Sequence, residues 1–466
     1  MRMRVAFQIV VLSLVGAFTA PVQAATPSYT REQAVALAQA QNPEIVIARK
    51  KLEAAGGGVI EARSGYLPSV VSNGLFRERE TQAGSNLRPE DYNATVRIVQ
   101  NLYSGGAVPS QVAIARLNLE KQELDLQAIS NRVAMDVRIA FNELLLNRSK
   151  IRVHEQSVGV LEEELKTQQE RLVAGTVGQL NVRRAEVALA NERPELIDSQ
   201  TQLQNSYLRL SELFGSDSRS AADKPNFEVV GLLQYEPRHP DLKESLARAD
   251  VDRPEIREKQ IDVEIEDQQA ALDRSALRPQ VEAFSGYEIY NERDPSVGHE
   301  FNHGYVVGVN ARWHIFDGFA TKGRLQATKA RREAAVLALA TARLSVASEV
   351  RSALLDLDQA THVMESETKN VQTADESFEI AKANLNAGLG TQLDILQAAS
   401  DVTRTRTTRL SAIYLHNVAL ARLAKACAIS TDAVGLAPKV GTAKNAREPS
   451  GNAVNVARPP SKLTNR

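Results

Sequence analysis

The sequence of 466 residues has a single cysteine and few aromatic residues. Cys427 is the only cysteine, which excludes an intrachain disulfide and any metal site built from several cysteines. Aromatic residues make up only 5% of the chain, a low share for a large compact globule. The net charge of −1 argues against nucleic acid as a partner. The remaining composition, rich in Ala, Leu, Gln, Glu and Arg, favours long helices with narrow apolar seams.

Motifs for enzymatic chemistry are also missing. The sequence has no phosphate-binding glycine loop, no nucleophile elbow and no metal-ligand spacing, so it predicts no enzyme and no cofactor. His299 and His303 are four residues apart, as in some metal sites, but glycines flank them. We therefore expect a solvated loop there, and not a metal site. We expect Cys427 in the apolar core of the last helix.

After residue 24, no stretch approaches 18 consecutive apolar residues, so the sequence predicts no transmembrane helix. Residues 1–24 have the pattern of a signal peptide: Arg2 and Arg4, an apolar stretch at 5–17, and small residues at 22–24. We therefore expect an exported chain that begins near Ala25. No cysteine follows that site, so we expect no lipid anchor at the N-terminus.

What the chain does have is a duplication. The segment NPEI at 42–45 returns as RPEI at 253–256, an offset of 211. The segment YSG at 103–105 returns as FDG at 316–318, and AG with QL at 174–180 returns at 387–393, both at an offset of 213. A near-constant offset across separated motifs predicts two copies of one unit of about 210 residues.

Each copy predicts the same succession of elements. A short helix precedes a helix that starts at Pro43 or Pro254, although we expect the glycines at 56–58 to loosen or interrupt the first of these. Segments of alternating polarity then predict a β-hairpin whose strands have the length of membrane-barrel strands. Apolar residues repeating every seven positions predict a long helical hairpin.

The predicted boundaries are: signal peptide 1–24; first repeat 25–215, with its β-hairpin at about 69–102 and helical hairpin at about 105–214; linker 216–240; second repeat 241–431, with its β-hairpin at about 280–313 and helical hairpin at about 319–428; and a disordered basic tail 432–466.

Two β-hairpins give only four strands per chain, which are too few to close a barrel. Because open sheet edges are not tolerated in lipid, membrane-embedded strands would have to be shared among several copies. Three copies would give twelve strands, and their long helices could close into a tube. The sequence therefore predicts a mainly α protein with a small β part, built from a duplicated unit of coiled-coil helices and β-hairpins, in an exported oligomeric channel.

The chain resembles the TolC family of outer-membrane efflux proteins. The resemblance runs in order from about residue 30 to 431, through the motifs NPE at 42–44, GYLP at 65–68, YSGG at 103–106, RPE at 253–255, FDG at 316–318 and GLGTQLDIL at 388–396. It implies a homotrimer with a helical α-barrel joined to a 12-stranded β-barrel in outer-membrane lipid. It also implies a passive exit duct of a tripartite efflux or type I secretion system, with a periplasmic adaptor and an inner-membrane ABC or RND-type pump as partners.

The resemblance also suggests residues that narrow the channel. Asp394 aligns with an aspartate that helps to constrict the periplasmic mouth in family members, and three copies would form an anionic ring. The family's second ring aspartate falls on Gln397, and Asn181 is the counterpart in the first repeat. The alternative stays open, because a carboxylate three residues after Thr391 also caps a helix start.

The hairpin turns are the second candidate site. We expect Gly175 and Gly388 to adopt positive φ there. An adaptor would touch the same turns, so Leu172, Leu385 and Leu389, together with Val173, are candidate contacts, and plain turn packing explains them equally well. Two alternatives for the whole chain are a periplasmic adaptor and a structural coiled-coil protein of the envelope. Two equivalent helical hairpins weigh against the adaptor, and the alternating segments weigh against the coiled coil.

Overall fold

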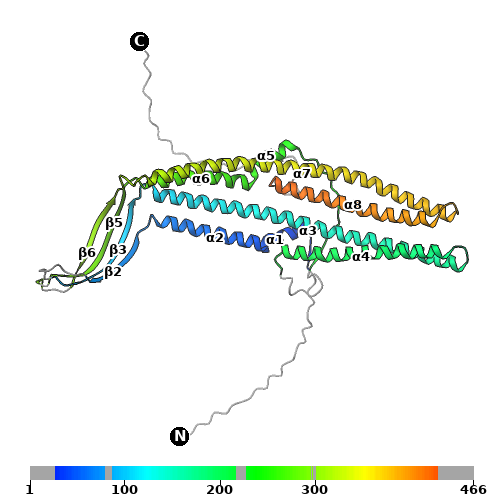
Figure 1. The fold of residues 1–466 in the computed structure, drawn as a ribbon, viewed down its shortest axis with the longest axis horizontal. Helices are drawn as coiled ribbons and strands as arrows, with labels where there is room; N and C mark the ends of the chain where they lie inside the picture. Colours follow the sequence, from blue (N-terminus) through cyan, green and yellow to red (C-terminus); the bar gives the residue numbers. More distant parts are fainter. Residues whose placement is uncertain (1–26, 79–86, 217–226, 295, 298–300, 429–466) are drawn as a thin grey trace, which may run out of the picture.

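The computed structural model describes residues 27–78, 87–216, 227–294, 296–297 and 301–428. The molecule is elongated, with a β-sheet at one end and long helices that run from it to two hairpin turns at the other end (Figure 1). The predicted signal peptide and the predicted tail at 432–466 lie outside the described residues.

The two repeats are built from matching helices. Helices α1 and α5 have 11 residues each, α2 and α6 have 22, α3 and α7 have 67, and α4 and α8 have 35. Their bounds are α1 Arg31–Gln41, α2 Pro43–Ser64, α3 Ala107–Val173, α4 Gln179–Leu213, α5 Leu242–Asp252, α6 Pro254–Ser275, α7 Ala320–Asn386 and α8 Gln392–Ala426. Equal lengths at near-constant offsets confirm the duplication. The 67-residue helices are about 100 Å long at 1.5 Å per residue.

The interruption expected at the glycines of α2 is wrong, because α2 runs unbroken through Gly56, Gly57 and Gly58. A Cβ atom at any of the three positions would meet no other atom within 4 Å, so close packing does not require glycine there. Each glycine destabilises a helix by about 1 kcal/mol relative to alanine. Helix α2 lies against α3 along its length, and this tertiary packing outweighs the weak intrinsic propensity.

The sheet joins the two repeats. Strands β2 (Ser69–Glu78) and β3 (Glu90–Tyr103) form the first predicted hairpin, and β5 (Gln280–Asn291) and β6 (Phe301–Arg312) form the second. All neighbours are antiparallel in the order β2-β3-β5-β6, so β3 and β5 pair across the repeat boundary. His303, which we expected in a loop, lies in β6. Within this sheet, β2 and β6 each have only one neighbour.

The helices follow the same lateral order as the strands. Next to the sheet the order is α2-α3-α6-α7, and towards the turns α4 and α8 take the places of α2 and α6. We call this four-element layer, sheet and helices together, the wall. One margin of the wall consists of β2, α2 and α4, and the other consists of β6 and α7.

Two apolar clusters hold the wall at mid-length, one in each repeat. The first joins α1, α3 and the end of α4, and includes Phe141 and Phe214. It also contains the short parallel strand pair of β1 (Ser28–Tyr29) and β4 (Glu228–Val229). The second cluster joins α5, α7 and the end of α8, and includes Val350 and Leu423. Cys427 is buried in it, which confirms its predicted place in the core.

The NPE and RPE motifs tie the start of one helix to the end of another. Asn42 caps α2, and its Nδ2 donates a hydrogen bond of 2.8 Å to the carbonyl of Leu213 at the end of α4. Arg253 stands at the same place before α6, and its Nη1 donates to the carbonyl of Lys425 near the end of α8, at 3.2 Å. Arg253 also forms an ion pair of 2.8 Å with Glu349 of α7. Both motif residues are buried, so the motif serves the junction of three helices.

One carboxyl in the seam between α3 and α6 is poorly matched to its surroundings. The Oε1 atom of Glu258 is buried and has no hydrogen-bond partner. Burial raises the pKa of Glu258 to about 7, and the neighbouring carboxylates of Asp125 and Glu255 act in the same direction. The folded protein therefore holds this proton more tightly than the unfolded chain, whose glutamate pKa is 4.5. The free energy of unfolding must fall as the pH rises from 4.5 to about 7.

We predict that Glu258→Gln stabilises the protein at pH 8 and leaves its stability unchanged at pH 4. The gain at pH 8 should be about 1 kcal/mol, less than the pKa shift alone implies, because the side chain is only partly buried. Thermal unfolding of both proteins at the two pH values measures the difference. Glu333→Gln, at an exposed site of α7, is the matched control. Equal changes in stability for both variants at both pH values would contradict the raised pKa of Glu258.

Candidate functional site

The two helical hairpins reverse direction at the end of the wall farthest from the sheet (Figure 1). Gly175 has a φ of +71° and Gly388 has a φ of +73°, which confirms the predicted positive φ. A Cβ atom at either glycine would meet nothing within 4 Å, so the left-handed backbone and not a close contact selects glycine.

Apolar side chains surround both turns, and several project into solvent. Among the predicted contacts, Val173 is 91% exposed and Leu389 is 82% exposed. Leu172 is less exposed, and Leu385 is partly buried against the turn. Leu389 and Val173 are thus free to contact another molecule, whereas Leu385 mainly serves the turn.

Two further exposed leucines begin the return helices and were missed by the sequence analysis. Leu180 on α4 is 60% exposed, and Leu393 on α8 is 54% exposed. They occupy equivalent positions in the two repeats, so a comparison of the repeats could have identified them. With Leu389 and Val173 they form the exposed apolar surface that we call the turn surface.

A hydrogen bond joins the two turns. Gln392, the first residue of α8, is buried, and its Nε2 donates to the carbonyl of Asn181 in the first turn of α4, at 2.9 Å. The Oε1 atom of Gln392 is also buried and has no partner. Asn181, a predicted constriction residue, is therefore held beside the start of α8 through its backbone.

Asp394 is part of a capping box at the start of α8. Its Oδ2 accepts hydrogen bonds from the backbone N–H and the hydroxyl of Thr391, at 2.7 and 2.8 Å. In return, the hydroxyl of Thr391 accepts a bond from the backbone N–H of Asp394, at 3.4 Å. The hydrogen bonds from the backbone and side chain of Thr391 lower the pKa of Asp394. The carboxylate is exposed and ionised at neutral pH, so the capping explanation is confirmed and a charged ring remains compatible with it.

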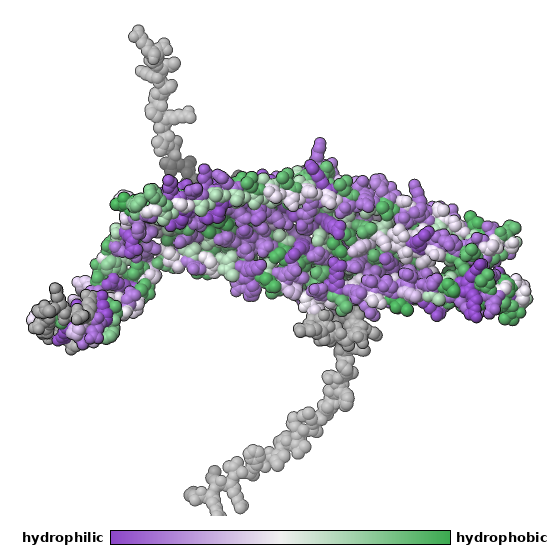
Figure 2. Space-filling model, viewed as in Figure 1, coloured by the Kyte–Doolittle hydropathy of each residue, from purple (hydrophilic) through white to green (hydrophobic). Residues whose placement is uncertain are grey.

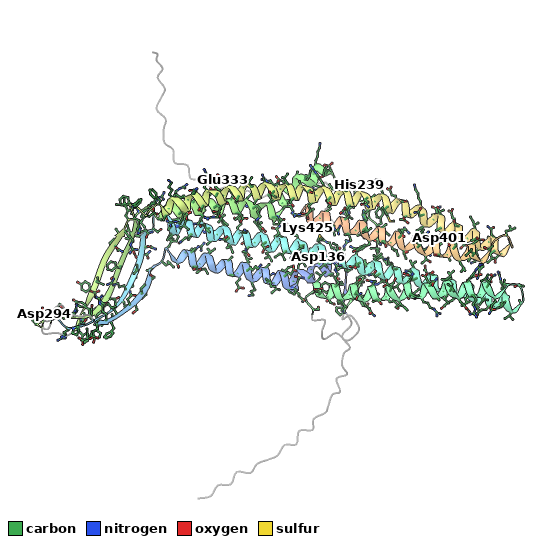
Figure 3. All side chains as sticks on the ribbon, in the orientation of Figure 1. Asp136, His239, Asp294, Glu333, Asp401 and Lys425 are labelled. Carbon is green, nitrogen blue, oxygen red and sulfur yellow. The ribbon has the colours of Figure 1, made fainter. Side chains whose placement is uncertain are left out.

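A second aspartate lies on the same face of α8 and was missed by the sequence analysis. Gln397 is one turn beyond Asp394, and its Nε2 lies 3.4 Å from both carboxylate oxygens of Asp401. Asp401 also pairs with Arg404 at 2.7 Å. It lies towards the turn end of the molecule (Figure 3). The spacing 394, 397, 401 follows the helical repeat, so these three side chains line one stripe.

The strand registers place apolar side chains on one face of the sheet. Val96 is paired with Tyr287, and Tyr287 with Tyr305, so these three point to the same face. Exposed hydrophobic residues continue along that face, and hydrophobic surface is visible on the sheet in Figure 2. The larger members are Val70, Phe76, Tyr92, Val96, Ile98, Tyr287, Ile289, Tyr305, Val307 and Val309.

The opposite face of the sheet carries its ion pairs. Arg77 pairs with Asp91 at 2.6 Å, and Arg97 pairs with Glu288 at 3.2 Å. The guanidinium of Arg97 also lies 5.4 Å from the centre of the Phe284 ring. One face of the sheet is therefore mainly apolar, and the other carries the ion pairs together with apolar residues such as Val71 and Leu75.

Both margins of the wall expose large apolar side chains. On α7, Leu337, Leu344, Leu355 and Ile380 are exposed, and their spacings of 7, 11 and 25 residues are close to whole turns. On the other margin, exposed apolar residues occur on α2 and α4: Ile47, Ile60, Leu180, Val187, Ile197 and Leu208. Apolar surface at both margins is typical of a wall that continues into further elements.

No cluster of three or more His, Cys, Asp or Glu side chains within the described residues is placed to hold a metal ion. None of the helices in the described part of the chain combines the length and the apolar character that crossing a membrane requires.

A family model described as outer membrane efflux protein matches residues 34–216 and 246–428, which are the two repeats. The cobalt-zinc-cadmium resistance protein CzcC of Cupriavidus metallidurans is 22% identical over 397 residues, which cover 84% of this chain and 88% of CzcC. The alkaline protease secretion protein AprF of Pseudomonas aeruginosa is 25% identical over 232 residues, which cover 49% of this chain and 46% of AprF. The outer membrane protein TolC of Vibrio cholerae is 30% identical over 200 residues, which cover 40% of this chain and 46% of TolC.

Solved structures of outer-membrane channels share the fold. The outer-membrane channel OprN superimposes with a TM-score of 0.73 at 17% identity, over 86% of this chain and 90% of OprN. The outer membrane protein VceC from Vibrio cholerae superimposes with a TM-score of 0.70 at 18% identity, over 85% of this chain and 95% of VceC. The predicted fold class, mainly α with a small β part built from duplicated helical and β-hairpins, is confirmed.

Proposed function

Because the chain belongs to the outer membrane efflux protein family, we propose that it forms a homotrimeric exit duct. The duct would conduct substrates passively from an inner-membrane pump across the periplasm and the outer membrane. The observation that carries the proposal is the lateral order common to strands and helices. It makes the chain one segment of a wall with two open margins, which needs further copies to close.

The sheet is compatible with three copies. The edge strands β2 and β6 have unpaired backbone groups, which lipid would not tolerate. Three copies with four strands each give a closed barrel of twelve strands, an even number found among outer-membrane barrels. In this arrangement the apolar face of the sheet contacts lipid, and the face with Arg97 and Glu288 lines the bore.

The chain contains a template for its own contact with the next copy. Within one chain, α3 of the first repeat packs on α6 and α8 of the second. The counterpart of α3 is α7, and the counterparts of α6 and α8 are α2 and α4. Applying the repeat relation once more places α7 of one copy against α2 and α4 of the next, and β6 against β2. These are the two open margins, and both expose apolar side chains.

Efflux and secretion both occur among the relatives. CzcC is named for resistance to cobalt, zinc and cadmium, and AprF is named for secretion of an alkaline protease. For this chain we propose the general arrangement, a periplasmic adaptor and an ABC or RND-type pump of the inner membrane. The turn surface is the proposed docking site because its exposed leucines lie at the end farthest from the sheet.

The constriction is proposed at the same end. Asp394, Gln397 and Asn181 lie near the start of the return helices, and Asp401 continues the stripe by one more turn. Three copies would bring three ionised Asp394 carboxylates around the axis of the duct, where they favour cations over anions.

The proposed trimer is tested by a disulfide between copies, which is designed from the contact of α3 with α8 within one chain. The hydroxyls of Ser157 on α3 and Thr403 on α8 are 3.0 Å apart. Their counterparts are Asn370 on α7 and Ala190 on α4, both exposed in the single chain. We predict that Asn370→Cys with Ala190→Cys, in a Cys427→Ala background, forms disulfides between copies on oxidation.

Non-reducing gels should then display covalent dimers and trimers and no larger species. The control pair is Asn370→Cys with Arg183→Cys, which moves one cysteine by about 10 Å along α4. Cross-linking of the control pair alone, or a purified protein that stays monomeric without cross-links, would contradict the proposed trimer.

The constriction is tested by separating charge from capping. We predict that Asp394→Asn lowers the preference of the channel for cations, measured as the reversal potential across a planar bilayer in a salt gradient. Thr391→Ala removes the capping hydroxyl and keeps the carboxylate, so its reversal potential should match that of the unaltered protein. If Asp394→Asn also leaves the reversal potential unchanged, the carboxylate only caps α8.

The docking surface is tested by capture of the partners. We predict that Leu389→Asp greatly reduces the recovery of an adaptor or inner-membrane pump cross-linked to the channel in cells, because it places a charge in an apolar contact. Mass spectrometry of the cross-linked material gives the measurement. Val251→Asp, at an equally exposed site on α5, should recover the partners in full. Equal recovery by both variants would remove Leu389 from the docking surface.

A further inference from the structure

Residues 230–240 connect β4 with α5, and we call them the strap. The strap crosses from the first repeat to the second over one face of the wall. Asn417 of α8 donates a hydrogen bond of 3.1 Å from its Nδ2 to the carbonyl of Gln234 in the strap. Leu233 and Tyr235 of the strap pack on a small apolar cluster formed by α7 and α8. Two cavities open beside the strap, and they differ in charge.

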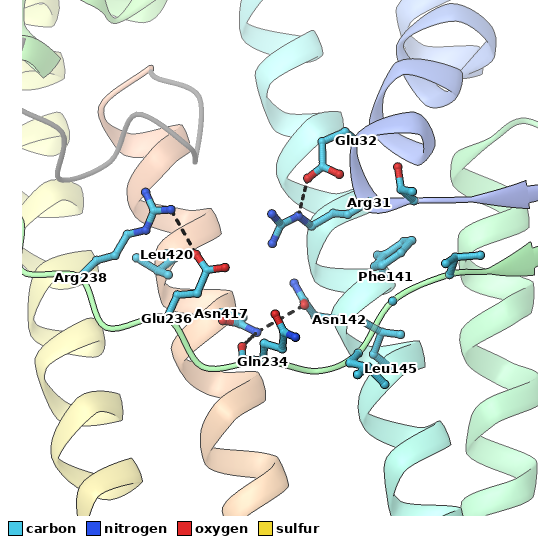
Figure 4. A pocket seen from close by; sticks show the side chains of 14 residues that line it. Arg31, Glu32, Phe141, Asn142, Leu145, Gln234, Glu236, Arg238, Asn417 and Leu420 are labelled. Atoms are coloured by element: carbon cyan, nitrogen blue, oxygen red, sulfur yellow. Dashed lines mark hydrogen bonds and ion pairs between the residues drawn. The ribbon is translucent and has the colours of Figure 1, made fainter. Parts of the chain in front are cut away.

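The first cavity has its charges matched. It has a volume of about 410 Å³ and lies between the strap, the start of α1, α3 and α8 (Figure 4). Arg31 pairs with Glu32 at 3.0 Å, and Arg238 pairs with Glu236 at 3.3 Å. Thr30, Asn142, Gln234 and Asn417 supply the remaining polar side chains of its lining. Each cation that lines this cavity has its own carboxylate, so the cavity does not call for a charged ligand.

The second cavity lies between the strap, α7 and α8, and has a volume of about 730 Å³. Leu233, Tyr235, Met364 and Ile413 give it apolar walls. Its volume lies in the range of cavities that hold small organic molecules. The cavity is lined by residues of one chain alone, so it is present before any further copy is added.

Charged groups at this cavity are not matched. Lys369 and Arg409 line it, with Glu365 as the only carboxylate among the lining residues. Glu365 lies 3.7 Å from the ring of His362, on the same helix. The Nε of Arg409 is buried without a hydrogen-bond partner. Neither the side chain of Arg409 nor that of Lys369 forms a hydrogen bond or ion pair with another residue of the described ranges.

Arg409 differs in this respect from the other arginines of α8. Arg404 pairs with Asp401 at 2.7 Å, Arg406 with Asp375 at 3.0 Å, and Arg422 with Asp356 at 3.6 Å. The buried Nε–H of Arg409 is unfavourable, because it loses water and gains no acceptor in return. The Nη groups of Arg409 are not buried in this way, and they can donate to an anion supplied from outside the chain.

We propose that the cavity between the strap, α7 and α8 binds a small organic monoanion, a carboxylate on an apolar body. The carboxylate accepts hydrogen bonds from Arg409 and takes Lys369 as its second cation, while the apolar body lies against Leu233, Tyr235 and Ile413. The lining carries two cations and one carboxylate, a net charge of +1, which matches one negative charge. A bound ligand ties the strap to both long helices of the second repeat.

The test measures binding of three probes that share a phenylalkyl body and differ in their polar head group: 4-phenylbutyrate (anionic), its neutral amide and 4-phenylbutylamine (cationic). Equilibrium dialysis against the full-length protein in a neutral detergent gives the affinities, with protein-free micelles subtracted. We expect saturable binding of the carboxylate, at least about tenfold weaker binding of the amide, and no saturable binding of the amine. Raising the salt concentration should weaken binding of the carboxylate.

Two variants locate the binding. Arg409→Gln should weaken binding of the carboxylate by about tenfold or more, and Lys369→Gln should weaken it by a smaller factor. Arg404→Gln, on the same helix and already paired with Asp401, is the matched control and should bind as the unaltered protein does. An unchanged melting temperature of the variants excludes a folding defect. The proposal fails if the unaltered protein shows no saturable binding, as when a neighbouring copy fills the cavity, or if Arg409→Gln binds equally well.

Discussion

The unpaired backbone of β2 and β6 is the constraint on which the architecture depends. A soluble sheet can leave its edge strands to water, but a sheet in lipid must satisfy every N–H and C=O within the protein. The helices continue the strands in the same lateral order, so any copy that pairs with β6 also lies beside α7. Closing the sheet and closing the helical layer are therefore one event, and the margins of both must be complementary at once.

The duplication supplies this complementarity at little evolutionary cost. The contact between β3 and β5, and that of α3 with α6 and α8, already join the two repeats within one chain. A second contact of the same kind, from α7 of one copy to α2 and α4 of the next copy, can use the same packing geometry. Helix α3 has neighbours on both sides and is mostly shielded from solvent, whereas α7 exposes Leu337, Leu344 and Leu355 on one stripe. The difference between these equivalent helices marks the side on which α7 lacks a neighbour in the single chain.

The sequence predicted the order and type of the elements because each has a local signal. Turn glycines such as Gly175 and the seven-residue repeat are read from nearby residues alone. The continuity of α2 through its three glycines was not predictable in this way, because packing against α3 decides it. The same holds for the candidate sites. The cap at Asp394 is local and was predicted, but the isolation of Arg409 depends on the strap, which is distant in sequence.

The two hairpin turns share their glycine and differ in how the return helix starts. Helix α8 begins with the capping box of Thr391 and Asp394, whereas α4 is preceded by Gly178, which has no side chain to cap it. The start of α4 is instead held from outside by Gln392, through the carbonyl of Asn181. Both hydrogen bonds from Thr391 end on Oδ2 of Asp394, and no described residue donates to Oδ1. One oxygen therefore fixes the helix start, and the other remains available to solvent and ions. Capping and a charged constriction are thus compatible in one residue, because the cap also keeps the carboxylate ionised.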